Sequence, residues 1–494
     1  MMSSKPGSFG AGFQPVILVV HSIACALPTA MVRFALPGLF CIVLVACGRP
    51  PTMLEQVKAH NELIVITRNS PTTFYEGPDG PTGFEYELAK RFSKYIGVEL
   101  RIVVPSNFSD ILPLTALGDA NLAAAGLTIT EKRKEKVRFG PVYQKITPQL
   151  VYRSGSVRPK TLDDLNGLLE VVAGSSHEEQ LQQSQKQFPD LSWQANPELE
   201  SDELLILVWQ QLIEYTIADS NELSVNRHIY PELKPAFDIS EPESLAWAFP
   251  LSEDNSLYDA ASSFFKEIQE NGTLERLIDR YYGHIEDFDY VGTRRYQAHI
   301  EQRLPQYQNF FMEAADEIGM DWRLLAAIGY QESHWDPDAV SPTGVRGIMM
   351  LTRAAAKDMD IADRKDPEQS IRGGARYLAR MLQRIPERVP EPDRTWLALA
   401  AYNVGYGHLE DARILTQKNK GNFDRWVDVK ESLPLLSQKK WFKQTRYGYA
   451  RGREPVRYVD NIRTYYDILV WLTEEQPDNP EAVIMLPQFD SPAL

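Results

Sequence analysis

One glutamate, Glu332, stands at the end of an apolar stretch that the sequence predicts to be a helix over residues 322–332, with Asp321 as its N-cap. Leu325, Ile328 and Glu332 are spaced i, i+3 and i+7, so they share one face of that helix. This face is apolar, and we expect it to be buried. A carboxyl group on a buried face loses hydration, so its pKa should rise, as a general acid requires near neutral pH. A surface glutamate at a helix end is the competing interpretation.

Further motifs follow this glutamate in a fixed order. Ser333 comes directly after it, Gly347-Ile348-Met349 follows a turn, and Ala401-Tyr402-Asn403 ends a later apolar stretch. Taken singly, each motif has an ordinary structural explanation, since a glycine permits a turn, a methionine fits a core, and the last motif extends an apolar stripe. Together, in this order, they resemble the soluble lytic transglycosylase family over residues 304–472.

The resemblance implies a mainly α, lysozyme-like domain that cleaves the glycan strands of peptidoglycan. It implies that Glu332 is the catalytic acid and then the base. The residues expected to hold substrate or orient that carboxyl are Ser333, Gly347, Met349, Tyr402, Asn403 and Tyr458. Among them, Tyr402 is expected to hydrogen-bond the Glu332 carboxyl, and Tyr458 resembles the later tyrosine of the family cleft. Met350 departs from the glutamine of many members, which removes one polar substrate contact but not the acid.

The motifs supply one carboxylate, whereas most glycosidases use two. The resemblance therefore implies an intramolecular reaction at the β-1,4 bond between N-acetylmuramic acid and N-acetylglucosamine. Glu332 protonates the glycosidic oxygen and then takes the proton of the muramoyl C6 hydroxyl, which leaves a 1,6-anhydro end. Two alternatives stay open. A second carboxylate facing Glu332 would indicate a muramidase-type hydrolase, and a domain that only grips glycan would indicate a non-enzymatic glycan- or solute-binding lipoprotein.

Residues 62–285 follow a different pattern, in which short β-rich runs alternate with helical stretches. Leu63–Thr67 and Leu100–Val104 are predicted strands, and Gly83 opens a predicted helix. This alternation indicates an α/β domain with a largely parallel sheet. The segments between residues 62 and 283 resemble the family-3 periplasmic solute-binding proteins, whose two lobes are joined by crossover strands.

This second resemblance implies an amino acid or muropeptide ligand. Arg133 is expected to bind a ligand carboxylate through a bidentate fork, and Asp219 an amino group. Thr128 belongs to the same motif as Arg133, and Ser175 precedes a helical stretch whose free N–H groups suit an anion. Without the resemblance, Arg133 would belong to a charged run typical of a solvated surface. Asp219 and Ser175 are compatible with ordinary helix caps. A hinge-closing domain fused to an enzyme also suggests regulation by ligand.

The first 46 residues have the features of a targeting segment. No Asp or Glu precedes Glu55, and Met31, a second candidate start, begins a basic stretch followed by an apolar run too short to span a bilayer. The run ends in Leu44-Val45-Ala46-Cys47, which resembles a bacterial lipobox. This implies lipid attachment at Cys47 and a place on the periplasmic face of the outer membrane. A plain signal peptide with an incidental cysteine is the alternative.

The sequence therefore predicts a multidomain chain, with a two-lobed α/β domain followed by a mainly α domain. The expected segments are 1–46 (targeting), 47–61 (tether), 62–285 (solute-binding-like), 286–303 (linker), 304–474 (lysozyme-like) and 475–494 (disordered tail). The net charge of −15 argues against nucleic-acid binding and against broad adhesion to acidic surfaces. All three cysteines lie in the first 47 residues, and no Cys/His cluster has metal-ligand spacing, so we expect no internal disulfide, metal or cofactor.

Overall fold

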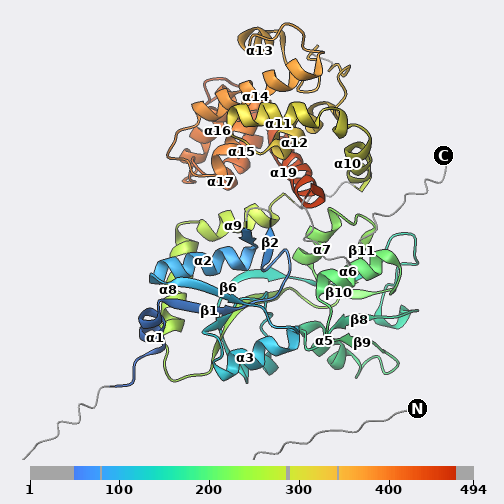
Figure 1. Cartoon of the computed structure of the whole chain (residues 1–494), viewed down its shortest axis with the longest axis vertical. Helices are drawn as coiled ribbons and strands as arrows, with labels where there is room; N and C mark the ends of the chain where they lie inside the picture. The colour runs from blue at the N-terminus through green and yellow to red at the C-terminus, as the bar shows by residue number, and fades with distance from the viewer. Residues whose placement is uncertain (1–48, 78–79, 285–289, 342–343, 474–494) are drawn as a thin grey trace, which may run out of the picture. The chain divides into compact units, whose positions relative to one another are not determined.

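The computed structural model describes residues 49–77, 80–284, 290–341 and 344–473 (Figure 1). The predicted targeting segment, its lipobox cysteine and the predicted tail lie outside these residues. Helix α1 (Met53–His60) falls in the predicted tether and begins with a capping box between Thr52 and Glu55. None of the helices in the described ranges is long and apolar enough to cross a bilayer.

The first lobe of the N-terminal domain is built on a five-stranded sheet in the order β4-β1-β5-β12-β6 (Figure 1). Its strands are β1 (Glu62–Ile66), β4 (Glu99–Val103), β5 (Leu122–Ala123), β6 (Val137–Ile146) and β12 (Glu243–Pro250). Its longer helices are α2 (Phe84–Ile96), α3 (Ile111–Leu117), α8 (Ser256–Glu270) and α9 (Thr273–Tyr282). Helices α2 and α8 bring Phe92 and Phe264 against Trp247 of β12, and these buried rings form the centre of this lobe's core.

The second lobe contains a three-stranded sheet with β7 (Pro148–Arg153) between β10 (Thr216–Asp219) and β11 (Leu233–Asp238). A parallel pair, β8 (Glu170–Val172) and β9 (Gln194–Asn196), lies in the same lobe. Its helices are α5 (Ser176–Ser184), α6 (Ser201–Gln210) and α7 (Ser220–Arg227). The chain enters this lobe between β6 and β7 and leaves it between β11 and β12, which confirms the two-lobed arrangement with crossover segments.

The expectation of a largely parallel sheet is correct only for part of the domain. Strands β4, β1 and β5 run parallel, as the alternating pattern predicts. In contrast, β12 is antiparallel to both β5 and β6, and β7 is antiparallel to both its neighbours. The crossovers lie between β6 and β7 and between β11 and β12. Because the chain passes from one lobe to the other at these points, it is this passage that determines the direction of the four strands, and not a local βαβ unit.

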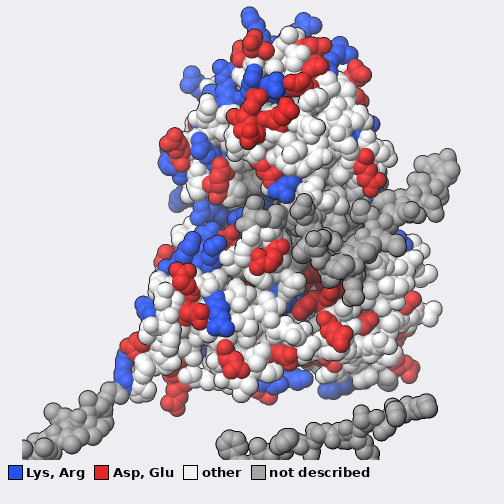
Figure 2. Space-filling model, in the orientation of Figure 1, with Lys and Arg blue, Asp and Glu red and all other residues white. Residues whose placement is uncertain are grey.

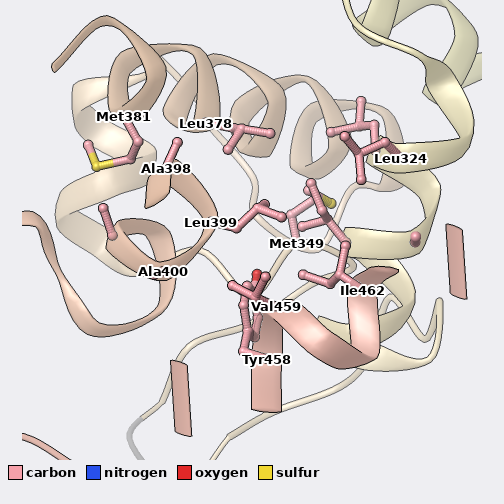
Figure 3. Close-up of a cluster of buried hydrophobic side chains, with 14 of the residues drawn as sticks. Leu324, Met349, Leu378, Met381, Ala398, Leu399, Ala400, Tyr458, Val459 and Ile462 are labelled. Atoms are coloured by element: carbon pink, nitrogen blue, oxygen red, sulfur yellow. The ribbon is translucent and has the colours of Figure 1, made fainter. Parts of the chain in front are cut away.

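The C-terminal domain is helical in the described residues. Its α-helices are α10 (Tyr290–Gln302), α11 (Gln308–Ile318), α12 (Trp322–Ser333), α13 (Arg353–Asp358), α14 (Pro367–Arg384), α15 (Asp393–Val404), α16 (Tyr406–Lys418), α17 (Trp426–Ser432), α18 (Lys439–Phe442) and α19 (Arg453–Thr473). Figure 3 shows side chains of α14, α15 and α19 converging, among them Leu378, Leu399, Val459 and Ile462, all fully buried. Helix α10 occupies most of the range predicted as a linker.

Charged side chains of both signs are intermixed on the face drawn in Figure 2. Among the surface ion pairs of the described residues, Arg372 pairs with Glu317 and Glu368 at 2.9 and 3.1 Å. Because neighbouring charges alternate in sign, this part of the surface produces no broad field of one sign.

Candidate active site

Helix α12 positions Glu332 in its last turn. The Asp321 side chain caps the helix by accepting a hydrogen bond from the Arg323 N–H at 2.9 Å, as the sequence predicts. Leu325 and Ile328, which share the Glu332 face, are fully buried. The helix ends at Ser333, and its C-cap, His334, has a left-handed φ of 55°. The buried apolar face therefore holds the carboxyl group in a fixed place at the end of the helix.

The Glu332 carboxyl has one hydrogen-bond partner in the described residues. The Tyr458 hydroxyl of α19 donates to Glu332 Oε1 at 2.6 Å. Burial raises the pKa of Glu332 to about 7, and this hydrogen bond opposes the rise. Of the charged side chains that the structure describes, none contributes to this pKa shift. A group with this pKa is substantially protonated near neutral pH and still ionises readily, as both halves of an acid–base cycle require.

Ser333 joins the end of α12 to the turn that contains Gly347 and Met349. Its hydroxyl lies 2.8 Å from the Ile348 carbonyl oxygen and 3.2 Å from that of Gly329, and it donates to them. Gly347 has φ +83°, and a Cβ atom there would lie 1.8 Å from a backbone oxygen of the adjoining loop. The turn therefore requires glycine at this position, and Met349, which follows it, is fully buried.

Tyr402 supports the same turn from α15. Its hydroxyl donates to the Met349 carbonyl oxygen at 3.1 Å, and its ring stacks beside that of Tyr458 with centroids 6.4 Å apart. The hydrogen bond to the Glu332 carboxyl that was expected from Tyr402 is made by Tyr458 instead. Asn403, the next residue, is exposed at the end of α15. The structure thus brings the predicted residues of this domain other than Asn403 to one region, with the tyrosine contacts differing from the expectation.

The acidic residues nearest to Glu332 in the sequence have other partners. Asp336 Oδ1 accepts a hydrogen bond from the Asp338 N–H at 2.9 Å, as in an Asx turn. Asp338 is 82% exposed and pairs with Lys365 at 2.9 Å. These two carboxylates stabilise a surface turn, and neither contributes to the pKa shift of Glu332.

The predicted ligand residues of the N-terminal domain meet between its lobes. Arg133 is 2% exposed and donates from its Nε to Glu179 at 3.1 Å, while its other nitrogens donate to the carbonyl oxygens of Thr128 and Gly174. Asp219 is hydrogen-bonded to His177 at 2.9 Å. Ser175 is the N-cap of α5, where its hydroxyl accepts from the Glu178 N–H. In this conformation Arg133, Asp219 and Ser175 are each hydrogen-bonded to a residue outside the predicted set, namely Glu179, His177 and Glu178.

Arg68, which was not among the predicted ligand residues, lies in the same cleft two residues after the end of β1. It is 7% exposed and forms ion pairs with Glu222 and Glu200 of the other lobe. A usable signal was its place after a predicted parallel strand, since ligands of open α/β sheets bind at the carboxyl ends of such strands.

The fold and the site together define a solute-binding domain fused to a transglycosylase domain. Two family models match, one described as bacterial extracellular solute-binding proteins, family 3, over residues 63–284, and one as the transglycosylase SLT domain over residues 309–425. Proteins named membrane-bound lytic murein transglycosylase F from Saccharophagus degradans and Hahella chejuensis are 48% and 50% identical, over 92% and 88% of this chain and 91% and 86% of theirs. The chain belongs to the membrane-bound lytic murein transglycosylase F family and is a lytic murein transglycosylase.

Two solved structures of solute-binding proteins are similar to part of this chain. Holo ArgBP from T. maritima is 22% identical and covers 45% of this chain and 97% of its own, with a TM-score of 0.40. The cysteine-binding protein from Campylobacter jejuni is 16% identical and covers 48% of this chain and 97% of its own, with a TM-score of 0.44.

Proposed function

We propose that Glu332 is the single acid and base that cleaves the β-1,4 bond between N-acetylmuramic acid and N-acetylglucosamine and leaves a 1,6-anhydromuramoyl end. The observation that carries this proposal is one carboxyl group, hydrogen-bonded by Tyr458, whose pKa of about 7 is perturbed by no carboxylate among the described residues. A hydrolase of the usual type needs a second carboxylate near the scissile bond. The two acids that follow in sequence belong to a surface turn, in which Asp338 is exposed and Asp336 half-buried, and this favours the intramolecular reaction.

The proton balance of the cycle requires only this group. Protonated Glu332 donates to the glycosidic oxygen, which leaves with N-acetylglucosamine, and the substrate N-acetyl group stabilises the developing positive charge at C1. The ionised carboxylate, stabilised by the Tyr458 hydroxyl, then takes the C6 hydroxyl proton while that oxygen bonds to C1. Glu332 ends the cycle protonated, and no water is consumed.

The remaining residues of this site have supporting roles in the proposal. Ser333 and Tyr402 donate hydrogen bonds to backbone carbonyl oxygens of the turn that contains Gly347 and Met349. These bonds fix the position of the turn relative to Glu332. Gly347 allows the turn to pass close to its neighbouring loop, and Met349 anchors it in the core. Asn403, exposed at the end of α15, is proposed to contact the glycan.

The pH dependence of kcat/KM tests the acid role of Glu332. We expect activity to fall as the pH rises past about 7, because the acid form is lost. The Tyr458 hydrogen bond lowers the pKa of Glu332. In Tyr458→Phe, the fall of kcat/KM at alkaline pH should therefore begin at a higher pH. It should also reduce the maximal rate by about 10- to 100-fold, the equivalent of one charge-assisted hydrogen bond.

Tyr402→Phe is the matched control, because it removes an equivalent hydroxyl that donates to a backbone carbonyl instead. Its alkaline limb should coincide with that of the unmodified protein. If kcat/KM falls at the same pH in all three proteins, Tyr458 does not act on the group whose ionisation causes the fall.

The N-terminal domain is proposed to bind an amino acid or muropeptide between its lobes, near Arg133, Asp219, Ser175 and Thr128. Ligand binding would then shift the balance between open and closed lobes and alter access to Glu332, provided that the ligand binds the two states differently. Calorimetry with amino acids and stem peptides, run beside the lytic assay, tests this regulation. Activity that is the same with and without a bound ligand would refute it.

We also propose that lipid attached to Cys47 holds the protein on the periplasmic face of the outer membrane. The lipobox-like sequence supports this, and the relatives are named membrane-bound. In cell fractionation, Cys47→Ser should move the protein from the membrane fraction to the soluble periplasmic fraction. Unchanged partition of the variant would exclude the anchor.

A further inference from the structure

Arg68 of the first lobe is held by acidic residues of the second lobe. Its Nη2 forms a hydrogen-bonded ion pair with Glu222 of α7, and its Nη1 lies 3.4 Å from Glu200, the N-cap of α6. These contacts cross the cleft between the lobes. They exist only while the lobes are closed, so separation of the lobes would remove the guanidinium from its partners.

The acidic side of this contact contains more negative charge than one arginine neutralises. Glu222, 2% exposed, also accepts a hydrogen bond from the Ser201 hydroxyl at 2.8 Å. Asp202, whose carboxylate accepts from Asn226, adds a third acid that acts on Arg68. Two carboxylates therefore pair with one guanidinium and a third acts on it, and the buried Glu222 carboxylate is costly to leave without a cation.

A second arginine crosses the cleft in the same direction. Arg133 of the first lobe binds Glu179 and the Gly174 carbonyl oxygen of the second lobe, and the Thr130 hydroxyl donates to Glu179 at 2.9 Å. Both cations thus come from the first lobe and both sets of acids from the second. Opening the lobes would leave the second lobe with a strongly acidic face on which His177, paired with Asp219, is the nearby basic group.

The space beside Arg68 is too small for a solute in the closed conformation. A cavity of about 10 Å³ lies between the lobes, lined by residues that include Arg68, Glu85, Asp219 and Glu222. This volume holds about one water molecule. The Arg68 Nε, although buried, has no hydrogen-bond partner in the part of the chain that the structure describes. The Arg68 side chain therefore occupies the space beside the acids while one of its own N–H donors stays without a partner in the described residues.

We propose that the acids Glu200, Asp202 and Glu222 form a subsite for the cationic group of a small ligand, a guanidinium or primary ammonium, and that Arg68 occupies this subsite when no ligand is bound. Arg68 then acts as an internal competitor that keeps the lobes closed. The inference rests on the proposed solute binding of this domain and adds the charge of the group that is recognised.

Isothermal titration calorimetry of the full chain tests this subsite. The probes are agmatine, which has a guanidinium and a primary amine but no carboxylate, and uncharged n-butanol as its apolar counterpart. The unmodified protein should bind agmatine weakly, and Arg68→Ala should bind it at least about tenfold more tightly, because the internal competitor is gone. Arg101→Ala, which removes an exposed arginine of the same lobe, should bind like the unmodified protein.

A second variant covers the case in which Arg68→Ala does not fold. Glu222→Gln keeps Arg68 and its contact with Glu200 but removes one acid of the subsite, so agmatine binding should weaken relative to the unmodified protein. Failure of the unmodified protein to bind agmatine at millimolar concentration would overturn the inference, and so would undiminished binding by Glu222→Gln. If agmatine does not bind but neutral or acidic amino acids do, the proposed solute binding of the domain stands and only the proposed subsite for a cationic group is refuted.

Discussion

Replacement of Glu332 by Gln should reduce the release of soluble muropeptides from purified peptidoglycan by at least about 1,000-fold, since a positioned acid–base group contributes about 10²- to 10⁴-fold and this one acts in both proton transfers. The amide has nearly the shape of the carboxyl group and can still accept the Tyr458 hydrogen bond. It can neither donate the proton to the glycosidic oxygen nor take one from the C6 hydroxyl. Binding of the glycan should therefore persist while turnover is lost.

Asp338→Asn is the matched control for loss of a carboxylate. Asp338 is 82% exposed and pairs with Lys365 on the surface turn that follows α12. Because exposed ion pairs contribute little, this variant should keep its activity within about twofold of the unmodified protein. Activity of Glu332→Gln within tenfold of the unmodified protein would show that another group supplies the proton.

The dependence of stability on pH shows whether Glu332→Gln has lost chemistry or structure. The folded-state pKa of Glu332, about 7, lies above its ordinary value, so the folded protein binds more protons than the unfolded chain between about pH 4.5 and pH 7. Glu332 therefore lowers the stability of the fold as the pH rises through this range. The amide does not ionise, so the variant should match the unmodified protein at pH 4 and exceed its stability at pH 8.5.

Gly347→Ala should lower the free energy of unfolding by more than about 3 kcal/mol, the sum of a left-handed conformation imposed on alanine and a clash with buried backbone. The added Cβ would lie 1.8 Å from the Arg364 carbonyl oxygen and 2.8 Å from the Ser370 hydroxyl. Since Ser370 also accepts a hydrogen bond from the Met349 N–H, relief of the clash must displace the turn beside Glu332. Urea unfolding measures the loss, and lytic activity should fall with it.

Gly319→Ala separates the two contributions to this loss. Gly319 ends α11 with φ +64°, and no heavy atom lies within 4 Å of the Cβ position. Alanine there carries only the conformational cost of about 1 to 2 kcal/mol. Equal losses in the two variants would mean that the loop around Arg364 yields freely and that Gly347 is required for its φ angle alone.

Local patterns predicted the position of the acid well. The N-cap at Asp321, the apolar spacing of Leu325 and Ile328, and the end of the helix beside Glu332 all follow from neighbouring residues, and the structure confirms them. The raised pKa of Glu332 also follows, because burial of the face causes it. These features depend on interactions within about three helical turns, which a sequence shows directly.

Long-range contacts were less accessible from the sequence. The hydrogen bond to Glu332 was expected from Tyr402, and only the packing of α19 against α12 assigns it to Tyr458. Arg68 was missed because its partners Glu200 and Glu222 lie more than a hundred residues further along the chain. The strand directions around the crossovers were predicted incorrectly for the same reason, since the passage between lobes sets them.

Mass spectrometry of peptidoglycan digested in water labelled with heavy oxygen tests the central claim most directly. If Glu332 transfers the C6 hydroxyl proton without help from water, every new muramoyl end will be anhydro, lighter by one water than a reducing end, and free of label. The same digest with Glu332→Gln should contain no new ends. Labelled reducing ends would contradict the account, because they require an activated water molecule and a base other than the one identified at the end of α12.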